Sequence, residues 1–134
     1  AGVAADAPWS DMAYKLVCYD GRPLMKLSPD KVSPPGAKKV FRFQDKGVWS
    51  HDVLGLSDES VTGAEEILVE VMAGGALSAA KPSLPEIRER LEADMHRLDP
   101  RFKALHRPPL YPVQISPKLQ RLTARVQEQL AEPE

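Results

Sequence analysis

The stretch from residue 65 to residue 98 reads EEILVEVMAGGALSAAKPSLPEIRERLEADMHRL, and its hydrophobic period changes partway along. Residues 65–72 are a short β-branched and apolar run that Gly74 and Gly75 end, which predicts a buried strand, and residues 77–80 are a candidate for a shorter one. After Pro82 the apolar residues recur at helical spacing. The change of period predicts mainly strands over residues 1–80 and mainly helices over residues 81–134.

The first predicted helix begins at a capping box. Ser83 and Glu86 have the S-x-x-E spacing, in which the hydroxyl accepts the free amide at Glu86 and the carboxylate reaches back to the cap. The apolar stripe that follows is ended by Asp99-Pro100 and consists of Ile87, Leu91, Met95 and Leu98. A core face is the favoured interpretation of this stripe, and a groove for a partner is the alternative.

A second helix is predicted at the end of the chain. A proline-rich connector at residues 107–112 leads into a candidate short strand at residues 111–115. Ser116 and Pro117 then suit the N-cap and the first helical position. The apolar stripe of this helix, which we also expect to be a core face, consists of Leu119, Leu122, Val126 and Leu130.

Further strands are predicted on the N-terminal side. Residues 12–19 and 23–28 flank Asp20-Gly21, a pair that suits a type I′ turn, so this segment predicts a hairpin. Residues 39–44 and 51–56 give two more strands, after a loop at residues 29–38 that three prolines make stiff. Strands followed by helices predict an α+β fold, with a small antiparallel sheet of five or six strands and two C-terminal helices.

Composition limits the class of partner and the cellular setting. Lys and Arg number 18 and Asp and Glu number 19, so the chain lacks the positive excess of a nucleic-acid-binding protein. No apolar run approaches the ~20 residues that a membrane helix needs. The single cysteine, Cys18, permits no disulfide within the chain and favours a reducing, cytoplasmic setting. The start at Ala1, without a signal-peptide pattern, suggests a processed protein or a piece of a longer one.

The sequence shows no motif of known catalytic chemistry. His51, His96 and His106 are far apart, and Cys18 has no partner at ligand spacing, so no metal site is predicted. There is no G-x-S-x-G motif and no glycine-rich phosphate loop. We therefore predict no catalytic residue, no metal ligand and no cofactor for this chain.

One group of basic residues is a candidate site for an anion. Lys26 and Arg42 lie on adjacent predicted strands, and the stiff loop between them could bring their charges together. The whole group is Lys26, Lys31, Lys38, Lys39 and Arg42. From spacing alone, a solvated basic loop is favoured over an anion site, and both interpretations stay open.

Several motifs occur in an order that resembles one enzyme family. They are DAP at residues 6–8, YKLV at 14–17, G-x-P-x-x-K-x-S at 21–28 and PG-x-K-x-x-x-R at 35–42. The second half adds D-x-L/I-x-L within residues 51–56, PSL-x-E-x-R within 82–91 and Y-x-V-x-I/L-S-x-x-L-x-x-L at 111–122. In this order they resemble the C-terminal portion of the nicotinate phosphoribosyltransferase family.

The resemblance implies a part of an enzyme that makes nicotinate mononucleotide from nicotinate and phosphoribosyl pyrophosphate, coupled to ATP. It implies a β/α barrel that carries the active site as the partner of this region, ATP and magnesium as requirements of the full enzyme, and a homo-oligomer. The family's phosphorylated histidine, nicotinate-binding residues and G-V/I-G-T phosphate loop have no counterpart in this sequence. We therefore expect the chain alone to be inactive.

The same resemblance singles out three of the basic residues. Lys26, Lys38 and Arg42 fit the family pattern, so they are the predicted anion contacts. The alternative to an enzyme part is a stand-alone anion-binding or structural module.

Overall fold

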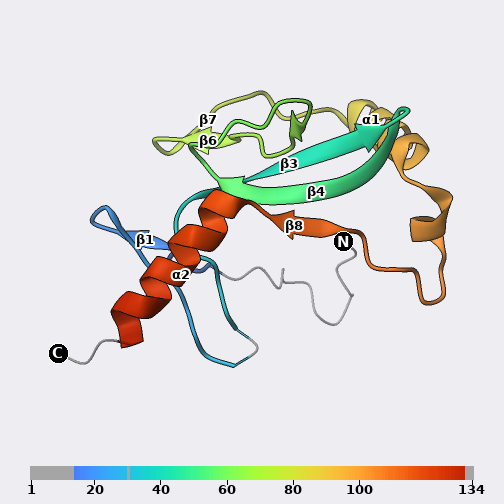
Figure 1. Ribbon diagram of the computed structural model, residues 1–134. Helices are drawn as coiled ribbons and strands as arrows, with labels where there is room; N and C mark the ends of the chain where they lie inside the picture. The colour runs from blue at the N-terminus through green and yellow to red at the C-terminus, as the bar shows by residue number, and fades with distance from the viewer. Residues whose placement is uncertain (1–13, 30, 132–134) are drawn as a thin grey trace, which may run out of the picture.

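A long antiparallel hairpin forms the centre of the fold in the computed structural model, which describes residues 14–29 and 31–131 (Figure 1). It consists of β3 (Lys38–Asp45) and β4 (Val48–Leu56). The turn between them places Lys46 and Gly47 at positive φ, a conformation that glycine adopts without strain. The DAP motif at residues 6–8 and the start of the strand predicted at residues 12–19 lie outside the described residues.

Two short strands extend the hairpin into a four-stranded sheet. β5 (Glu65–Glu66) pairs antiparallel with β3, and β8 (Val113–Ile115) pairs parallel with β4, which gives the order β5-β3-β4-β8. The prediction of a wholly antiparallel sheet is therefore wrong at its β8 edge. The reason is that the chain passes through a helix before it returns to β4, and a crossover of this kind permits a parallel strand.

Two small ribbons account for the remaining strands. β1 (Cys18–Tyr19) and β2 (Arg22–Pro23) flank a turn in which Asp20 and Gly21 both have positive φ, as a type I′ turn requires. β6 (Met72–Ala73) and β7 (Ala76–Leu77) flank the paired glycines. The described residues thus form eight strands in three sheets, not one sheet of five or six strands.

The segment at residues 65–72 differs most from expectation. It was predicted to be a buried strand, but only Glu65 and Glu66 pair with β3, and the exposed side chains that follow include Leu68, Val69 and Val71. A run that is apolar on both faces needs a layer on each side. Within the described residues no second layer covers this segment, so the strand ends after two residues.

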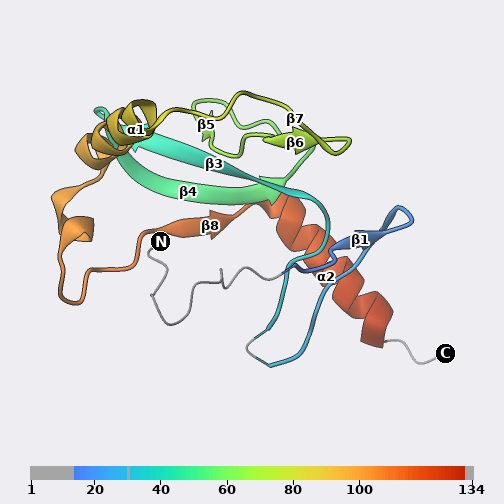
Figure 2. The same cartoon turned by 180° about the vertical axis from the view of Figure 1, so that it is seen from behind.

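Both predicted helices are present, and they lie at opposite ends of the hairpin. α1 (Leu84–Arg97) lies beside the β3–β4 turn, and α2 (Pro117–Ala131) starts near the end of β4 (Figures 1 and 2). The predicted capping box of α1 is formed, because the Ser83 amide donates to the Glu86 carboxylate over 2.6 Å and the Ser83 side chain accepts from the Glu86 amide. A short 3-10 helix, η1 (Pro100–Lys103), follows α1. Neither helix in the described part of the chain is long and apolar enough to cross a membrane.

The core lies where α2 meets the hairpin. The buried apolar side chains at this contact include Phe41 of β3 and Leu119 and Val126 of α2, which confirms two positions of the predicted α2 stripe as core positions. Ser116 fixes the start of α2, since its hydroxyl accepts the Leu119 amide and donates to Glu59 over 2.7 Å. Glu59 also accepts the Leu56 amide, so one carboxylate joins the end of β4 to the cap of α2.

The stripe of α1 does not form a core face. Of the residues in α1, none is buried. The prediction that this stripe packs into the core is therefore wrong for the described part of the chain. The physical reason is that the sheet offers α1 only the β3–β4 turn region, while α2 covers the other end of the hairpin (Figure 2).

Candidate functional site

The strongest polar interaction of the sheet joins its two central strands. Arg42 of β3 faces Asp52 of β4 in the ladder, and its Nε and Nη2 atoms donate to the two carboxylate oxygens over 2.8 and 2.7 Å. Asp52 is buried, and the Tyr111 hydroxyl donates to it over 3.4 Å. The hydrogen bond from Arg42 to Asp52 raises the pKa of the guanidinium, so this arginine keeps its charge at all ordinary pH values.

Aromatic rings surround this ion pair. The Arg42 guanidinium lies 4.4 Å from the centre of the Trp49 ring and 5.7 Å from that of Tyr111. Arg97, at the end of α1, lies 5.0 Å from the same Trp49 ring and pairs with Glu65. We call Arg42, Trp49, Asp52, Arg97 and Tyr111 the Arg42 cluster. It connects the sheet to α1 and to the connector before β8 through cation–π and ionic contacts.

A hollow of about 380 Å³ lies against the Arg42 cluster. Its walls are mainly apolar, and they consist of Arg42, Trp49, Leu98, Phe102, Pro108, Pro109 and Tyr111. The Arg42 charge is matched by Asp52, and burial, more than the neighbouring charges, raises the pKa of Tyr111. The hollow therefore offers neither a free charge nor a group poised for proton transfer near neutral pH.

The predicted anion contacts do not converge in the structure. Lys38 Nζ donates to the backbone oxygens of Pro34 and Gly36 over 2.7 and 2.6 Å, and burial lowers the pKa of this amine. Arg42 is held by Asp52. Lys26 is exposed and lies in an isolated bridge with Ser33, not on a strand next to β3 as predicted. Two of the three cations thus serve internal contacts, and their role as anion contacts stays a prediction.

The two remaining basic residues of the predicted group are also placed by the structure. Lys39 pairs with Glu66 of β5 over 3.0 Å, and Lys31 is exposed in the loop. Across residues 14–29 and 31–131, no group of three or more His, Cys, Asp and Glu residues could hold a metal ion.

Sequence reasoning missed the partners of Arg42. It placed Arg42 and Asp52 on separate predicted strands without pairing them, and it did not single out Trp49 or Tyr111. The sequence carries only part of this signal, because a charged residue on a central strand needs an opposite charge nearby but its spacing does not say which one. Regular pairing about the Lys46-Gly47 turn would place Arg42 opposite His51, and only the irregularity in the ladder between Phe43 and Gln44 brings it opposite Asp52.

Comparisons with known proteins identify the relatives of this chain. The family model described as the nicotinate phosphoribosyltransferase C-terminal domain matches residues 61–123. The chain is 39% identical over 119 residues to nicotinate phosphoribosyltransferase pncB2 of Mycobacterium tuberculosis, a match that covers 87% of this chain and 26% of that protein. It is 34% identical over 138 residues to nicotinate phosphoribosyltransferase of Bos taurus, covering 84% of this chain and 26% of that protein.

A solved structure supports the same relationship. The crystal structure of human nicotinic acid phosphoribosyltransferase matches with a TM-score of 0.72 and 27% identity, covering 89% of this chain and 27% of that chain. The chain spans about a quarter of the length of these relatives. The chain therefore belongs to the nicotinate phosphoribosyltransferase family, and the part of the family that it matches is the C-terminal portion.

Proposed function

We propose that this chain works as the C-terminal part of a nicotinate phosphoribosyltransferase. The complete enzyme makes nicotinate mononucleotide from nicotinate and phosphoribosyl pyrophosphate with ATP, a reaction of NAD salvage. The observation that carries this proposal is a match over 87% of this chain to only 26% of a relative of that name. The human enzyme of known structure supports it, with a fold that matches over 89% of this chain.

The chemistry of the reaction belongs, in this proposal, to the rest of the enzyme. Transfer of a phosphoribosyl group needs donors held around a pyrophosphate leaving group, with a divalent metal in most enzymes. Two of the predicted anion contacts already have acceptors within the domain, since Lys38 donates to backbone carbonyls and Arg42 donates to Asp52. We therefore place ATP and magnesium with the barrel domain, and we propose a homo-oligomeric, cytoplasmic enzyme.

The role left to this chain is structural support for that active site. The Arg42 cluster and the joint between Glu59 and Ser116 fix the hairpin relative to both helices. A rigid domain of this kind can hold neighbouring catalytic groups in place without contacting the substrate. The alternative of a stand-alone anion-binding module is less well supported. The side chains of Lys38 and Arg42 already bind acceptors within the domain, and among the three proposed contacts only Lys26 is exposed without such a side-chain bond in the described residues.

Reconstitution tests this function directly. The 134-residue chain is mixed with the N-terminal portion of the same enzyme, and nicotinate mononucleotide is measured with nicotinate, phosphoribosyl pyrophosphate, ATP and magnesium. We expect no turnover from this chain alone and turnover from the mixture above that of the N-terminal portion. A mixture no more active than the N-terminal portion would count against the proposal, and turnover by this chain alone would overturn its inactivity.

A further inference from the structure

The outer face of α1 is apolar and has no partner among the described residues. The four side chains that form it keep between 40% and 79% of their surface exposed: Leu84, Ile87, Leu91 and Met95. In α2, a helix of nearly the same length, Leu119 is 0% and Val126 5% exposed. The two helices have similar sequence patterns, so the difference lies in what covers them.

The described contacts hold α1 only near its C-terminal end. Arg97 pairs with Glu65 over 2.7 Å and lies 5.0 Å from the Trp49 ring. The first turns of the helix have the capping box, which adds about 1 kcal/mol, but no buried residue. An isolated helix of 14 residues is marginal in water, and most helices in proteins are stabilised by packing of an apolar face. The exposed face of α1 thus lacks the packing that such a helix normally has.

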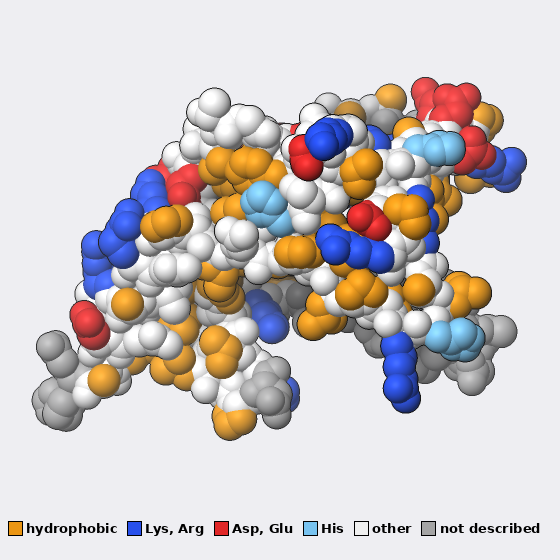
Figure 3. All heavy atoms as spheres, turned by 45° about the vertical axis from the view of Figure 1, so that its right-hand side comes forward, with side chains coloured by type: hydrophobic (Ala, Val, Ile, Leu, Met, Phe, Trp, Pro, Cys, Tyr) orange, Lys and Arg blue, Asp and Glu red, His pale blue; other side chains and the backbone are white. Residues whose placement is uncertain are grey.

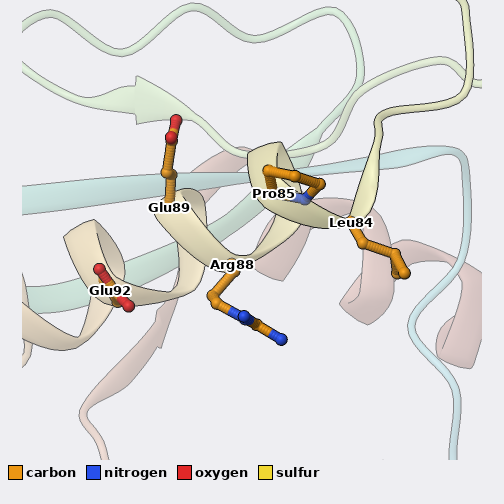
Figure 4. A pocket seen from close by; sticks show the side chains of 5 residues that line it. All are labelled: Leu84, Pro85, Arg88, Glu89 and Glu92. Atoms are coloured by element: carbon orange, nitrogen blue, oxygen red, sulfur yellow. The ribbon is translucent and has the colours of Figure 1, made fainter.

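The surroundings of this face have the character of an interface. A hollow of about 220 Å³ lies along its first turns, lined by Leu84, Pro85, Arg88, Glu89 and Glu92, and the side chains of Arg88 and Glu89 point away from each other (Figure 4). A second hollow of about 340 Å³ lies further along and includes Leu91 and Met95. Charged side chains of both signs lie among hydrophobic ones on this side of the molecule (Figure 3). An apolar line with hollows and a charged rim is the usual anatomy of a protein interface.

We propose that the outer face of α1, defined as Leu84, Ile87, Leu91 and Met95, is the surface on which this domain docks against the rest of its own enzyme. The inference rests on the proposed function and adds to it the location of the contact. The match to the human enzyme covers 27% of that chain, so most of the enzyme lies outside this domain. A segment tethered in the same polypeptide acts at an effective concentration of the order of millimolar, which favours it over a second copy of the domain.

Hydrogen exchange compares α1 in two contexts, without any mutation. Amide exchange is measured by mass spectrometry for residues 84–97 in the 134-residue chain and in the full-length enzyme. We expect exchange in α1 to be roughly tenfold slower or more in the full-length enzyme, as for a helix whose packing is completed. Peptides from α2, which already packs on the hairpin, are expected to change much less. Equal exchange of α1 in the two proteins would overturn the proposal.

A matched pair of variants tests whether the stripe itself makes the contact. Leu91→Asp places a charge on the stripe, whereas Ala93→Asp places the same charge about 200° around the helix. Both residues are exposed, so we expect α1 exchange to be similar in the two isolated variant chains. In the full-length enzyme, Leu91→Asp should remove most of the added protection and Ala93→Asp should keep it. Equal protection in the two full-length variants would overturn the proposal.

Two further outcomes separate the alternatives. If the 134-residue chain sediments as a dimer that Leu91→Asp dissociates, the face belongs to a second copy and the proposal is wrong. If the full-length enzyme makes nicotinate mononucleotide but α1 is not protected, the proposed function stands and the docking surface fails. If α1 is protected in a full-length protein that lacks this activity, the surface stands and the proposed function fails.

Discussion

Arg42 and Asp52 face each other across the central hairpin and form a two-bond ion pair, with donor–acceptor distances of 2.8 and 2.7 Å. The pair is not an isolated surface contact, because Asp52 is buried and Arg42 lies against the Trp49 and Tyr111 rings. A family motif that ends at Arg42 and another that begins at Asp52 thus meet at one point of the fold. In this structure the arginine of the first motif stabilises the domain.

Replacing Asp52 by Asn should destabilise the chain strongly. The substitution keeps the size of the side chain but leaves Arg42, whose side chain is 22% exposed, without its counter-charge. We expect a loss of about 3 kcal/mol in the free energy of unfolding, the low end for breaking a buried ion pair because Arg42 keeps some contact with water. Urea unfolding measures it. Asp58→Asn, which removes an exposed pair with Lys118, is the control and should change little.

Tyr111 should make stability fall at high pH. Burial, followed by the charge of Asp52, raises the pKa of its hydroxyl above the ordinary tyrosine value of 10.0. The folded protein therefore holds this proton at a pH where the unfolded chain has released it, so the stability from this group is complete below pH 10 and is lost as pH rises through the folded pKa. Absorbance titration should show a late phase of tyrosine ionisation that Tyr111→Phe removes. An unchanged titration in the variant would contradict this assignment.

The sequence predicted best those elements whose signals are local. The capping box at Ser83 and Glu86 and the Asp20-Gly21 turn depend on residues a few positions apart, and both are present as expected. The prediction of a buried strand at residues 65–72 is wrong, because burial of this segment depends on a second layer that the described residues do not supply. Local chemistry fixes a turn or a cap, whereas burial is decided by distant segments.

The same limit explains the candidate site. Lys38 and Arg42 were singled out by charge and by family resemblance, but their true neighbours are the Pro34 and Gly36 carbonyls and Asp52. Spacing shows that cations are near each other in sequence and does not show which acceptors each one reaches. The stripe of α1 is a related case, since its period predicted a helix correctly but could not show that no described residue buries it.

Ser116→Ala should destabilise α2 and its joint with the hairpin together. Its hydroxyl accepts the Leu119 amide over 3.1 Å and donates to Glu59 over 2.7 Å, and the residue is buried. We expect a loss of about 2 kcal/mol, the upper end for removing an N-cap residue, because Glu59 also loses a partner. Thermal or urea unfolding measures it. Ser83→Ala removes the exposed cap of α1 and should cost less, and a larger cost there would contradict this account.

Gly36→Ala should destabilise the fold more than Gly47→Ala, although both glycines have positive φ, at 77° and 82°. Each substitution forces an L-residue into the left-handed region, at a cost of roughly 1–2 kcal/mol. At Gly47 the added methyl group meets open space, so the backbone cost is the whole loss of stability expected for this variant. At Gly36 the new Cβ would lie 3.2 Å from Leu56 and 3.3 Å from Leu122, which must shift where α2 packs on the end of β4. Urea unfolding of the two variants isolates the packing cost as their difference, and equal losses would show that α2 is free to move away at this contact.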